Sequence, residues 1–286
     1  MLNIGEYRQK VDRLTDHLPW AALVAPGIIL NKDGSFQRSF RFRGPDLESA
    51  TPSELVAACA RVNNVMRRFG SGWATFFEAE RFRAPGYPVS EFPDDASWLV
   101  DEERRAQFES GGAVADAGKQ SARPHFETAY YQTLLFMPLV DNVASAERGL
   151  IETPDDKSKR DWRYEMAAFQ AETDRAHDLL GQVLAEIAPL DDAETLTYLH
   201  GTISTKRHTI QPPQTPMYLD GLLGDTSLRG GLDPMLGDAH LRCLSILGFP
   251  GTTQPGLLDA LNHLEFPYRW TTRFIALDKT RANKAL

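Results

Sequence analysis

The chain has 286 residues, of which 42% are hydrophobic and 24% are charged, so its composition is that of a globular protein with a packed core. Its formal net charge of −8 argues against a dedicated nucleic-acid-binding domain, which usually presents a basic face, and we expect no sequence-specific nucleic acid binding. No signal peptide is evident, and the apolar run at residues 20–30 has about half the length that crosses a bilayer. We therefore expect a soluble chain.

The N-terminal part predicts a β-hairpin. Residues 20–43 read as β structure with a turn at residues 31–34, because Asp-Gly supplies the positive φ values that tight hairpin turns need. After the turn, Phe36, Phe40 and Phe42 recur at even spacing with polar residues between them. This alternation predicts a half-buried strand whose outer face is basic.

A helix and two further strands follow along the chain. Thr51 and Glu54 form a capping box that opens a helix running to about Phe69, and the next strand is expected at residues 73–81. This predicts a β–α–β unit. The run at residues 128–138 is the strongest single strand signal in the chain.

The middle of the chain contains the predicted boundary between two lobes. Residues 84–124 have loop composition with a short helical piece near 97–109. Residues 152–160 are a charged run typical of a linker. The predicted lobes are residues 1–145 and 146–286.

A long amphipathic helix is predicted near residues 161–188. Its seam repeats at alternating steps of four and three and ends before Pro189. The seam residues are Trp162, Met166, Phe169, Thr173, Ala176, Leu180, Val183 and Ile187. The plain interpretation is a helix packed on a sheet. The alternative is a coiled-coil surface for a partner.

The C-terminal segment predicts mixed secondary structure after this helix. A second helix is expected at residues 191–200 and an extended proline-rich connector at 211–216. A β–loop–α–β unit is expected with elements at 239–248, 256–264 and 268–277. The predicted fold class is therefore α+β, with mixed sheets flanked by helices in two lobes.

One loop has the glycine spacing of a phosphate-binding P-loop. Gly251 and Gly256 are separated by four residues, but a Walker A loop also needs Lys and Ser/Thr directly after the second glycine to hold phosphate and Mg²⁺. Leu257 and Leu258 stand there instead, and Pro255 removes a further N–H donor. We interpret the loop as a strand-to-helix turn, and no complete Walker A pattern occurs elsewhere in the 286 residues.

Other site patterns are equally weak. None of the seven histidines forms HExxH, and His200 and His208 lie too far apart in sequence for one helical face. Cys59 and Cys243 lack a CxxC or Cys/His context, so we expect two buried free thiols and no zinc site there. Gly-x-Ser-x-Gly is absent.

Charged clusters also have ordinary explanations. Three acidic pairs suit helix caps and solvated faces, at residues 94–95, 155–156 and 191–192. Lys206-Arg207-His208 suits a solvated surface. We assign no catalytic, cofactor-binding or metal-binding residue from the sequence.

Several long stretches together resemble one family. They are LPWAALVAPGIILNKDGSFQRSFRFRGPDLES (18–49), FGSGWATFFEAER (69–81), YYQTLLFMP (130–138), LGFPGTTQPGLLDAL (247–261) and RWTTRFIALD (269–278). The chain resembles the N-terminal region of TrbE-type members of the TrbE/CagE/VirB family, the ATPases that power type IV secretion and conjugative DNA transfer. The resemblance runs along the whole chain.

The resemblance implies more than these residues carry. Family members are far longer, and their Walker A and B motifs lie in a C-terminal RecA-like motor domain that would begin beyond residue 286. ATP and Mg²⁺ are thus implied for the full-length family, while this chain has no family catalytic residue and is expected to be inactive by itself. A truncated gene product, a pseudogene-like fragment and a deliberately shortened chain all fit this expectation.

The resemblance also implies a role and a location. In the family, the N-terminal region docks the ATPase on inner-membrane components at the cytoplasmic face and contributes to oligomer assembly. It implies a cytoplasmic, peripheral location at the bacterial inner membrane, with inner-membrane and cytoplasmic secretion components as partners, and self-association. The strand carrying Arg38, Arg41 and Arg43 is a candidate contact surface, since arginine and aromatic residues are enriched at interfaces.

Three functional hypotheses follow. The leading one is a docking and assembly module of a type IV secretion ATPase. The second is a stand-alone oligomerisation module built on the seam of residues 162–187. The third is an unrecognised α+β enzyme, which requires a polar pocket that joins several titratable residues.

Overall fold

The computed structural model describes residues 13–45, 49–84, 86–110, 125–138, 162–215, 217–246, 248, 251–252, 256–278 and 283. The chain forms two compact units, each built from separate segments. Unit 1 comprises Met1–Phe77, Tyr131–Pro255 and Thr272–Leu286, and unit 2 comprises Glu78–Tyr130 and Gly256–Thr271. The predicted boundary near residues 145–160 lies outside the described residues, so the division into lobes 1–145 and 146–286 stays a prediction.

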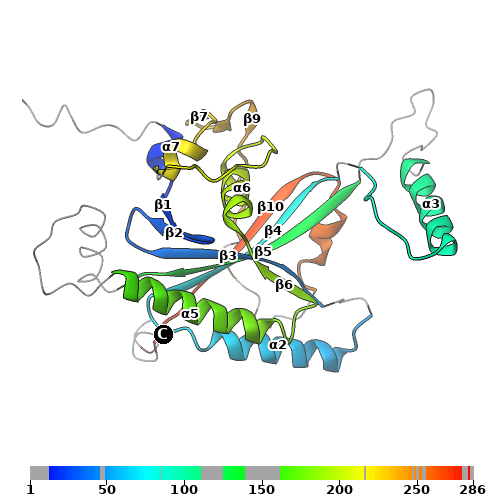
Figure 1. The fold of residues 1–286 in the computed structure, drawn as a ribbon, viewed down its shortest axis with the longest axis horizontal. Coiled ribbons are helices and arrows are strands. Elements are labelled where there is room, and N and C mark those ends of the chain that lie inside the picture. The colour runs from blue at the N-terminus through cyan, green and yellow to red at the C-terminus, as the bar shows by residue number, and fades with distance from the viewer. Residues whose placement is uncertain are drawn as a thin grey trace, which may run out of the picture. The chain divides into compact units, whose positions relative to one another are not determined.

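Seven strands of the described residues form one sheet in the order β1-β2-β3-β5-β4-β10, with β6 paired to β3 (Figure 1). The strands are β1 (Trp20–Ala25), β2 (Ile28–Asn31), β3 (Phe36–Arg43), β4 (Trp73–Arg83), β5 (Phe126–Phe136), β6 (Glu186–Pro189) and β10 (Tyr268–Ile275). The pairs β1–β2, β2–β3 and β3–β6 are antiparallel. A second, three-stranded sheet joins β7 (Leu228–Arg229), β8 (Met235–Leu236) and β9 (Ala239–His240).

Helices accompany the main sheet, and the predicted α+β class is confirmed. The helices are α1 (Leu14–His17), α2 (Pro52–Met66), α3 (Asp95–Ser110), α5 (Trp162–Leu180), α6 (Asp192–Ile203), α7 (Leu219–Leu223) and the 3₁₀-helix η2 (Asp259–His263). The β–α–β unit expected early in the chain is present as β3, α2 and β4.

Local signals placed several of these elements correctly. The turn between β2 and β3 has Gly34 at φ 82°, and the Asn31 N–H donates to the Ser35 carbonyl at 2.8 Å, which closes the hairpin. At the start of α2, the Glu54 N–H donates to Thr51 Oγ1 while the Glu54 carboxylate accepts from the Thr51 N–H. Both features depend on residues close in sequence, which is why the sequence predicts them.

Strand β2 shows how unit 1 builds a core on both faces of its sheet. All four of its residues are buried, and successive side chains point to opposite faces. Ile28 and Leu30 pack with Phe36 and with Phe169 of α5. Ile29 packs on the other face, among residues of β1, α6 and α7. In Figure 1, α2 and α5 run along one side of these strands and α6 and α7 lie on the other.

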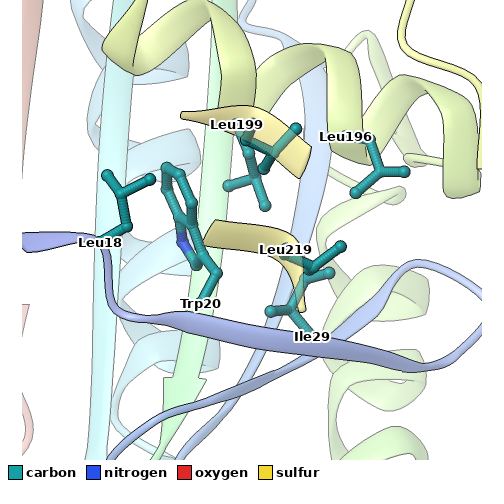
Figure 2. Close-up of a cluster of buried hydrophobic side chains, with 7 residues drawn as sticks. Leu18, Trp20, Ile29, Leu196, Leu199 and Leu219 are labelled. Atoms are coloured by element: carbon teal, nitrogen blue, oxygen red, sulfur yellow. The ribbon is translucent and has the colours of Figure 1, made fainter. Parts of the chain in front are cut away.

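The core on the α6 and α7 side is a compact group of aliphatic side chains around one indole ring. Figure 2 shows Trp20 and Ile29 from the sheet directed toward Leu196 and Leu199 of α6 and Leu219 of α7. Leu196 and Leu219 are at most 1% exposed. Burial of such side chains stabilises a fold by about 1.5–3 kcal/mol each, so this cluster fixes α6 and α7 on the sheet.

The seam of α5 packs against the sheet, as the plain interpretation predicted. Phe169, Thr173, Ala176 and Leu180 are the buried residues of α5. Ala176 and Leu180 join a core cluster with Phe40, Val65 of α2 and Leu134 of β5. The alternative interpretation of the seam as a free coiled-coil surface is therefore wrong, because these side chains are already covered within the chain.

Helix α5 is shorter than the predicted 161–188. It ends at Leu180, Gly181 follows, and residues 186–189 form β6, so the seam residues Val183 and Ile187 lie beyond the helix. Glycine disfavours helix continuation. The edge of β3 also offers backbone partners, and Phe42 pairs with Ile187 there. Strand pairing in the folded chain thus outweighs the heptad pattern at this point.

Strand β3 is also more deeply buried than predicted. Residues 36–40 are all buried, because helices cover both faces of the sheet at this point. Arg38 lies on the same face as Phe36 and Phe40 and is only 8% exposed. The predicted contact surface of Arg38, Arg41 and Arg43 is therefore wrong for Arg38, while Arg41 and Arg43 are exposed.

The C-terminal segment differs most from expectation. The predicted strand at 239–248 is limited to β9, and residues 241–246 have no regular structure. The predicted helix at 256–264 is only the short η2, and Gly256 has φ 80°, a left-handed conformation that does not begin a right-handed helix. The predicted last strand is present as β10.

Candidate functional site

A pocket of about 690 Å³ lies within unit 1, next to the core cluster of α2 and α5. It is lined by one face of α2, the first half of β4, the turn after α5 and the end of β10. Characteristic lining residues are Val62, Met66, Trp73, Phe77, Leu184 and Phe274. The volume falls in the range of about 300–1,000 Å³ that is usual for ligand pockets.

The pocket offers apolar surface rather than catalytic groups. Asn63 and Thr75 supply polar atoms, and Cys59 is the one titratable side chain among the described residues that line it. At the end of β10, Phe274 and Ile275 are 51% and 59% exposed, so apolar side chains remain in contact with solvent. General acid–base chemistry needs converging titratable groups, and this lining does not supply them.

Both cysteines are free thiols, but the expectation that they are buried is wrong, because both are exposed. Cys59 lies on the same face of α2 as Val62 and Met66, which are partly buried against the core. Cys59 lines the pocket, where no further element packs over it. Hydrophobic neighbours in the sequence therefore did not determine burial at this position.

A second cluster joins three residues that are distant in sequence. His200 is the buried last-turn histidine of α6, His208 follows in an irregular segment, and Asp225 comes after α7. His200 Nε2 lies 3.2 Å from Asp225 Oδ1, and the two imidazole centroids are 4.7 Å apart. The sequence analysis placed the two histidines too far apart for one helical face, but a helix and a loop bring them together.

Asp225 is held by several donors. Lys206 Nζ donates to its Oδ2 at 2.7 Å, and Thr226 Oγ1 donates to its Oδ1 at 2.8 Å. Partial burial alone would raise the pKa of this carboxyl group, but the hydrogen bonds from Lys206, Thr226 and His200 outweigh burial and lower the pKa well below its usual value. Asp225 is therefore a carboxylate at neutral pH. Lys206 belongs to the basic run that the sequence assigned to a solvated surface.

Unit 2 contains a buried ionic cluster that the sequence analysis did not identify. Glu78 and Glu80 of β4 are 8% and 5% exposed, and both pair with Arg269 of β10, which lies 2.8 Å from Glu80. Thr271 Oγ1 also donates to Glu78 at 3.2 Å. Burial raises the pKa of Glu78, and the charge of Arg269 opposes that rise. The alternate spacing of the two glutamates on one strand was the available sequence signal.

The remaining sequence candidates have structural roles. Asp191 caps α6 through the Glu194 N–H at 2.8 Å, and Asp94 accepts the Ser97 N–H at 2.8 Å near the start of α3. The pair at 155–156 lies outside the described residues. Of the glycine-spaced loop, Gly251 and Gly256 are described, and residues 253–255 lie outside the description.

The described helices include none that is both long enough and apolar enough to cross a membrane. This finding applies to the described stretches of the chain, which cover all of the helices named above.

Comparisons with known proteins identify the family. Residues 27–143 match the family described as type IV secretion system ATPase VirB4/TrbE, N-terminal domain. Conjugal transfer protein TrbE of Rhizobium radiobacter is 29% identical over 303 residues, which cover 99% of this chain and 35% of that relative. The chain thus spans about a third of that relative's length.

Two relatives from Sinorhizobium fredii (strain NBRC 101917 / NGR234) also match, and their names describe them as the first and the second of two pieces of a probable conjugal transfer protein TrbE. The first piece is 33% identical over 141 residues, which cover 48% of this chain and 87% of that relative. The second piece is 36% identical over 93 residues, which cover 32% of this chain and 14% of that relative. The chain therefore belongs to the VirB4/TrbE family of type IV secretion system ATPases and corresponds to its N-terminal region.

Proposed function

We propose that this chain is a docking and assembly module of a TrbE-like ATPase that energises conjugative DNA transfer through a type IV secretion system. The observation that carries the proposal is the match of residues 27–143 to the N-terminal domain of that family. Its partners in this proposal are inner-membrane and cytoplasmic components of the secretion system, and its location is the cytoplasmic face of the inner membrane. Self-association with other copies belongs to the proposed assembly role.

The apolar pocket of unit 1 is the proposed point of contact with an apolar segment of a secretion-system protein. Its lining combines aromatic and aliphatic side chains from α2, β4 and β10 without a charged group among the described residues. The exposed Phe274 and Ile275 extend this apolar surface. Apolar and aromatic side chains that enter such a recess are the usual anchors of protein–protein interfaces.

ATP hydrolysis belongs, in this proposal, to the motor region of longer family members, which bind ATP and Mg²⁺. The residues after Gly256 are Leu257 and Leu258 rather than the Lys and Ser/Thr that hold phosphate and metal. The isolated 286-residue chain is expected to show no tight Mg-ATP binding and no ATPase activity. Isothermal titration with Mg-ATP tests this, and a micromolar site would overturn it.

The docking proposal can be tested with two alanines that are neighbours on α2. Ala58 lines the pocket, whereas Ala57 is exposed and does not. The tagged chain is co-expressed with individual inner-membrane and cytoplasmic components of the source organism's secretion system, and co-purification is measured. Wild type and Ala57→Asp are expected to retain a component that Ala58→Asp loses, because a carboxylate in the pocket must be desolvated when an apolar segment enters.

Two results would contradict the docking proposal. One is that no secretion component co-purifies with the wild-type chain, and the other is that Ala58→Asp retains the component as well as Ala57→Asp does. Circular dichroism and thermal unfolding of both variants establish that Ala58→Asp is folded. Size-exclusion chromatography with light scattering, over a range of concentrations, measures self-association in the same samples.

A further inference from the structure

We propose that His200, His208 and Asp225 form a binding site for a divalent transition-metal cation, with Zn²⁺ as the best match. The three residues each offer one ligand atom, and these atoms all lie within 4.8 Å of one another. Two imidazoles and one carboxylate form a donor set that zinc accepts in proteins, whereas Mg²⁺ and Ca²⁺ prefer oxygen ligands. The sequence analysis assigned no metal ligand, so this site arises from the tertiary structure.

The distances are close to those of a metal site. Zinc bonds of about 2.0–2.1 Å in tetrahedral geometry place neighbouring ligand atoms roughly 3.4 Å apart. His200 Nε2 and Asp225 Oδ1 are already 3.2 Å apart. The third ligand, His208, has an exposed side chain in an irregular segment, so a small side-chain rotation can complete the set.

The framework of the site holds two of its ligands in place. His200 is 1% exposed and follows the buried Leu196 and Leu199 of α6, which pack in the core shown in Figure 2. Asp225 is oriented by hydrogen bonds from Thr226 to Oδ1 and from Lys206 to Oδ2. Such outer partners of a ligand carboxylate are usual around protein-bound zinc and orient it toward the metal.

Lys206 is the group that opposes this assignment, because its ammonium charge repels a cation. Its side chain is 55% exposed and contacts the oxygen of Asp225 that does not face His200. It can therefore keep that contact or turn into solvent when a metal binds Oδ1. Three protein ligands leave a fourth position for water, so the ion would link α6, the segment at His208 and the residue after α7.

Zinc binding to the full chain, after treatment with a chelator, tests the proposal. Isothermal titration with Zn²⁺ is expected to give one ion per chain, and Zn²⁺ is expected to raise the midpoint of thermal unfolding, because a ligand that binds the folded state stabilises it. His208→Ala is the informative variant, since His208 is exposed and its removal spares the core. It should weaken the affinity by about tenfold or more, as should Asp225→Asn.

His240→Ala is the matched control. His240 also pairs with an aspartate, with Nδ1 2.7 Å from Asp233 Oδ2, but the described residues place no third ligand at that pair. Its loss should leave the affinity for Zn²⁺ unchanged. Co²⁺ provides a spectroscopic readout, with the visible absorption bands of a four-coordinate ion in wild type and their loss in His208→Ala.

Defined results overturn the zinc site. They are the absence of Zn²⁺ binding to wild type, equal affinity in wild type and His208→Ala, or a loss of affinity in His240→Ala as large as that in His208→Ala. If no Zn²⁺ binds, the three residues serve only as a hydrogen-bonded contact between α6 and the loop after α7. The docking role proposed above does not depend on this outcome.

Discussion

The guanidinium group of Arg38 lies against helix α5, where its Nη1 donates to Asp174 Oδ1 at 2.6 Å and to Thr173 Oγ1 at 2.9 Å. The arginine also lies over the ring of Phe40, with 5.3 Å between its Cζ and the ring centroid. Its side chain is 10% exposed, whereas that of Asp174 is 53% exposed. The pair therefore fastens the long helix to the sheet from a buried cation and a largely solvated anion.

Removal of this arginine should destabilise the fold. Arg38→Ala is expected to lower the free energy of unfolding by about 2–3 kcal/mol, because it removes charge-assisted hydrogen bonds and buried packing while Asp174 can be solvated. Arg41→Ala on the same strand is the control, since Arg41 is 52% exposed and 3.8 Å from Glu194. It should change stability by no more than about 0.5 kcal/mol. Urea unfolding measures both, and equal losses would contradict the burial of Arg38.

Phe169 should behave as a core residue rather than as an interface residue. It is 1% exposed and stacks with Phe36 and Trp73 at centroid distances of 5.8 and 5.5 Å. Phe169→Ala is expected to cost about 3–5 kcal/mol, and the neighbouring exposed Gln170→Ala to have little effect.

Phe169→Glu distinguishes the core from the oligomer interface more directly. A carboxylate at this buried position should abolish cooperative unfolding, because it is desolvated without a partner. Circular dichroism and light scattering report fold and mass together. A well-folded variant that has only lost its self-association would restore the seam as an oligomer interface.

The ionic cluster of unit 2 should give a measurable dependence of stability on pH. Burial raises the pKa of Glu78 in the folded state above its ordinary value of 4.5, so the folded state binds this proton more tightly than the unfolded state. The contribution of Glu78 to stability is then complete below pH 4.5 and declines as the pH rises through the folded-state value. Glu78→Gln should remove that decline when unfolding free energies are compared across this pH range.

Arg269→Met tests the other side of the same cluster. It leaves Glu78 and Glu80 buried without their shared cation, and we expect a loss of about 3–5 kcal/mol at neutral pH. The loss should become smaller in the double variant with Glu78→Gln, because one of the two buried charges is then absent. Additive losses in the two single variants and the double variant would show that these residues do not interact.

Thiol labelling of the native chain provides a test of the cysteine environment. Cys59 and Cys243 are both exposed, so both should react with an aromatic disulfide reagent without denaturant, which attacks accessible thiolates. Two thiols per chain should be released before any unfolding, as measured by absorbance. A thiol that reacts only in denaturant would place that cysteine in the core, as its sequence neighbours had suggested.

Local chemistry explains which elements the sequence predicted well. The Asp33–Gly34 turn and the capping boxes at Thr51 and Asp191 involve residues at most four positions apart, so their hydrogen bonds depend little on the rest of the fold. The long patterned strands β4 and β5 were found for a related reason, since their β-branched and aromatic content is itself a strand signal. The family was also apparent from long stretches of sequence.

Only the tertiary structure determined which patterned side chains are buried and which distant groups meet. The heptad seam gave no sign that α5 ends at Leu180, because the competing hydrogen bonds come from the edge of β3. Alternation placed Arg38 on the face of Phe36, but helix α5 supplies the partners that bury it. His200 and Asp225 meet because the shared core of α6 and α7 brings two separate segments together, and no spacing in the sequence encodes that contact.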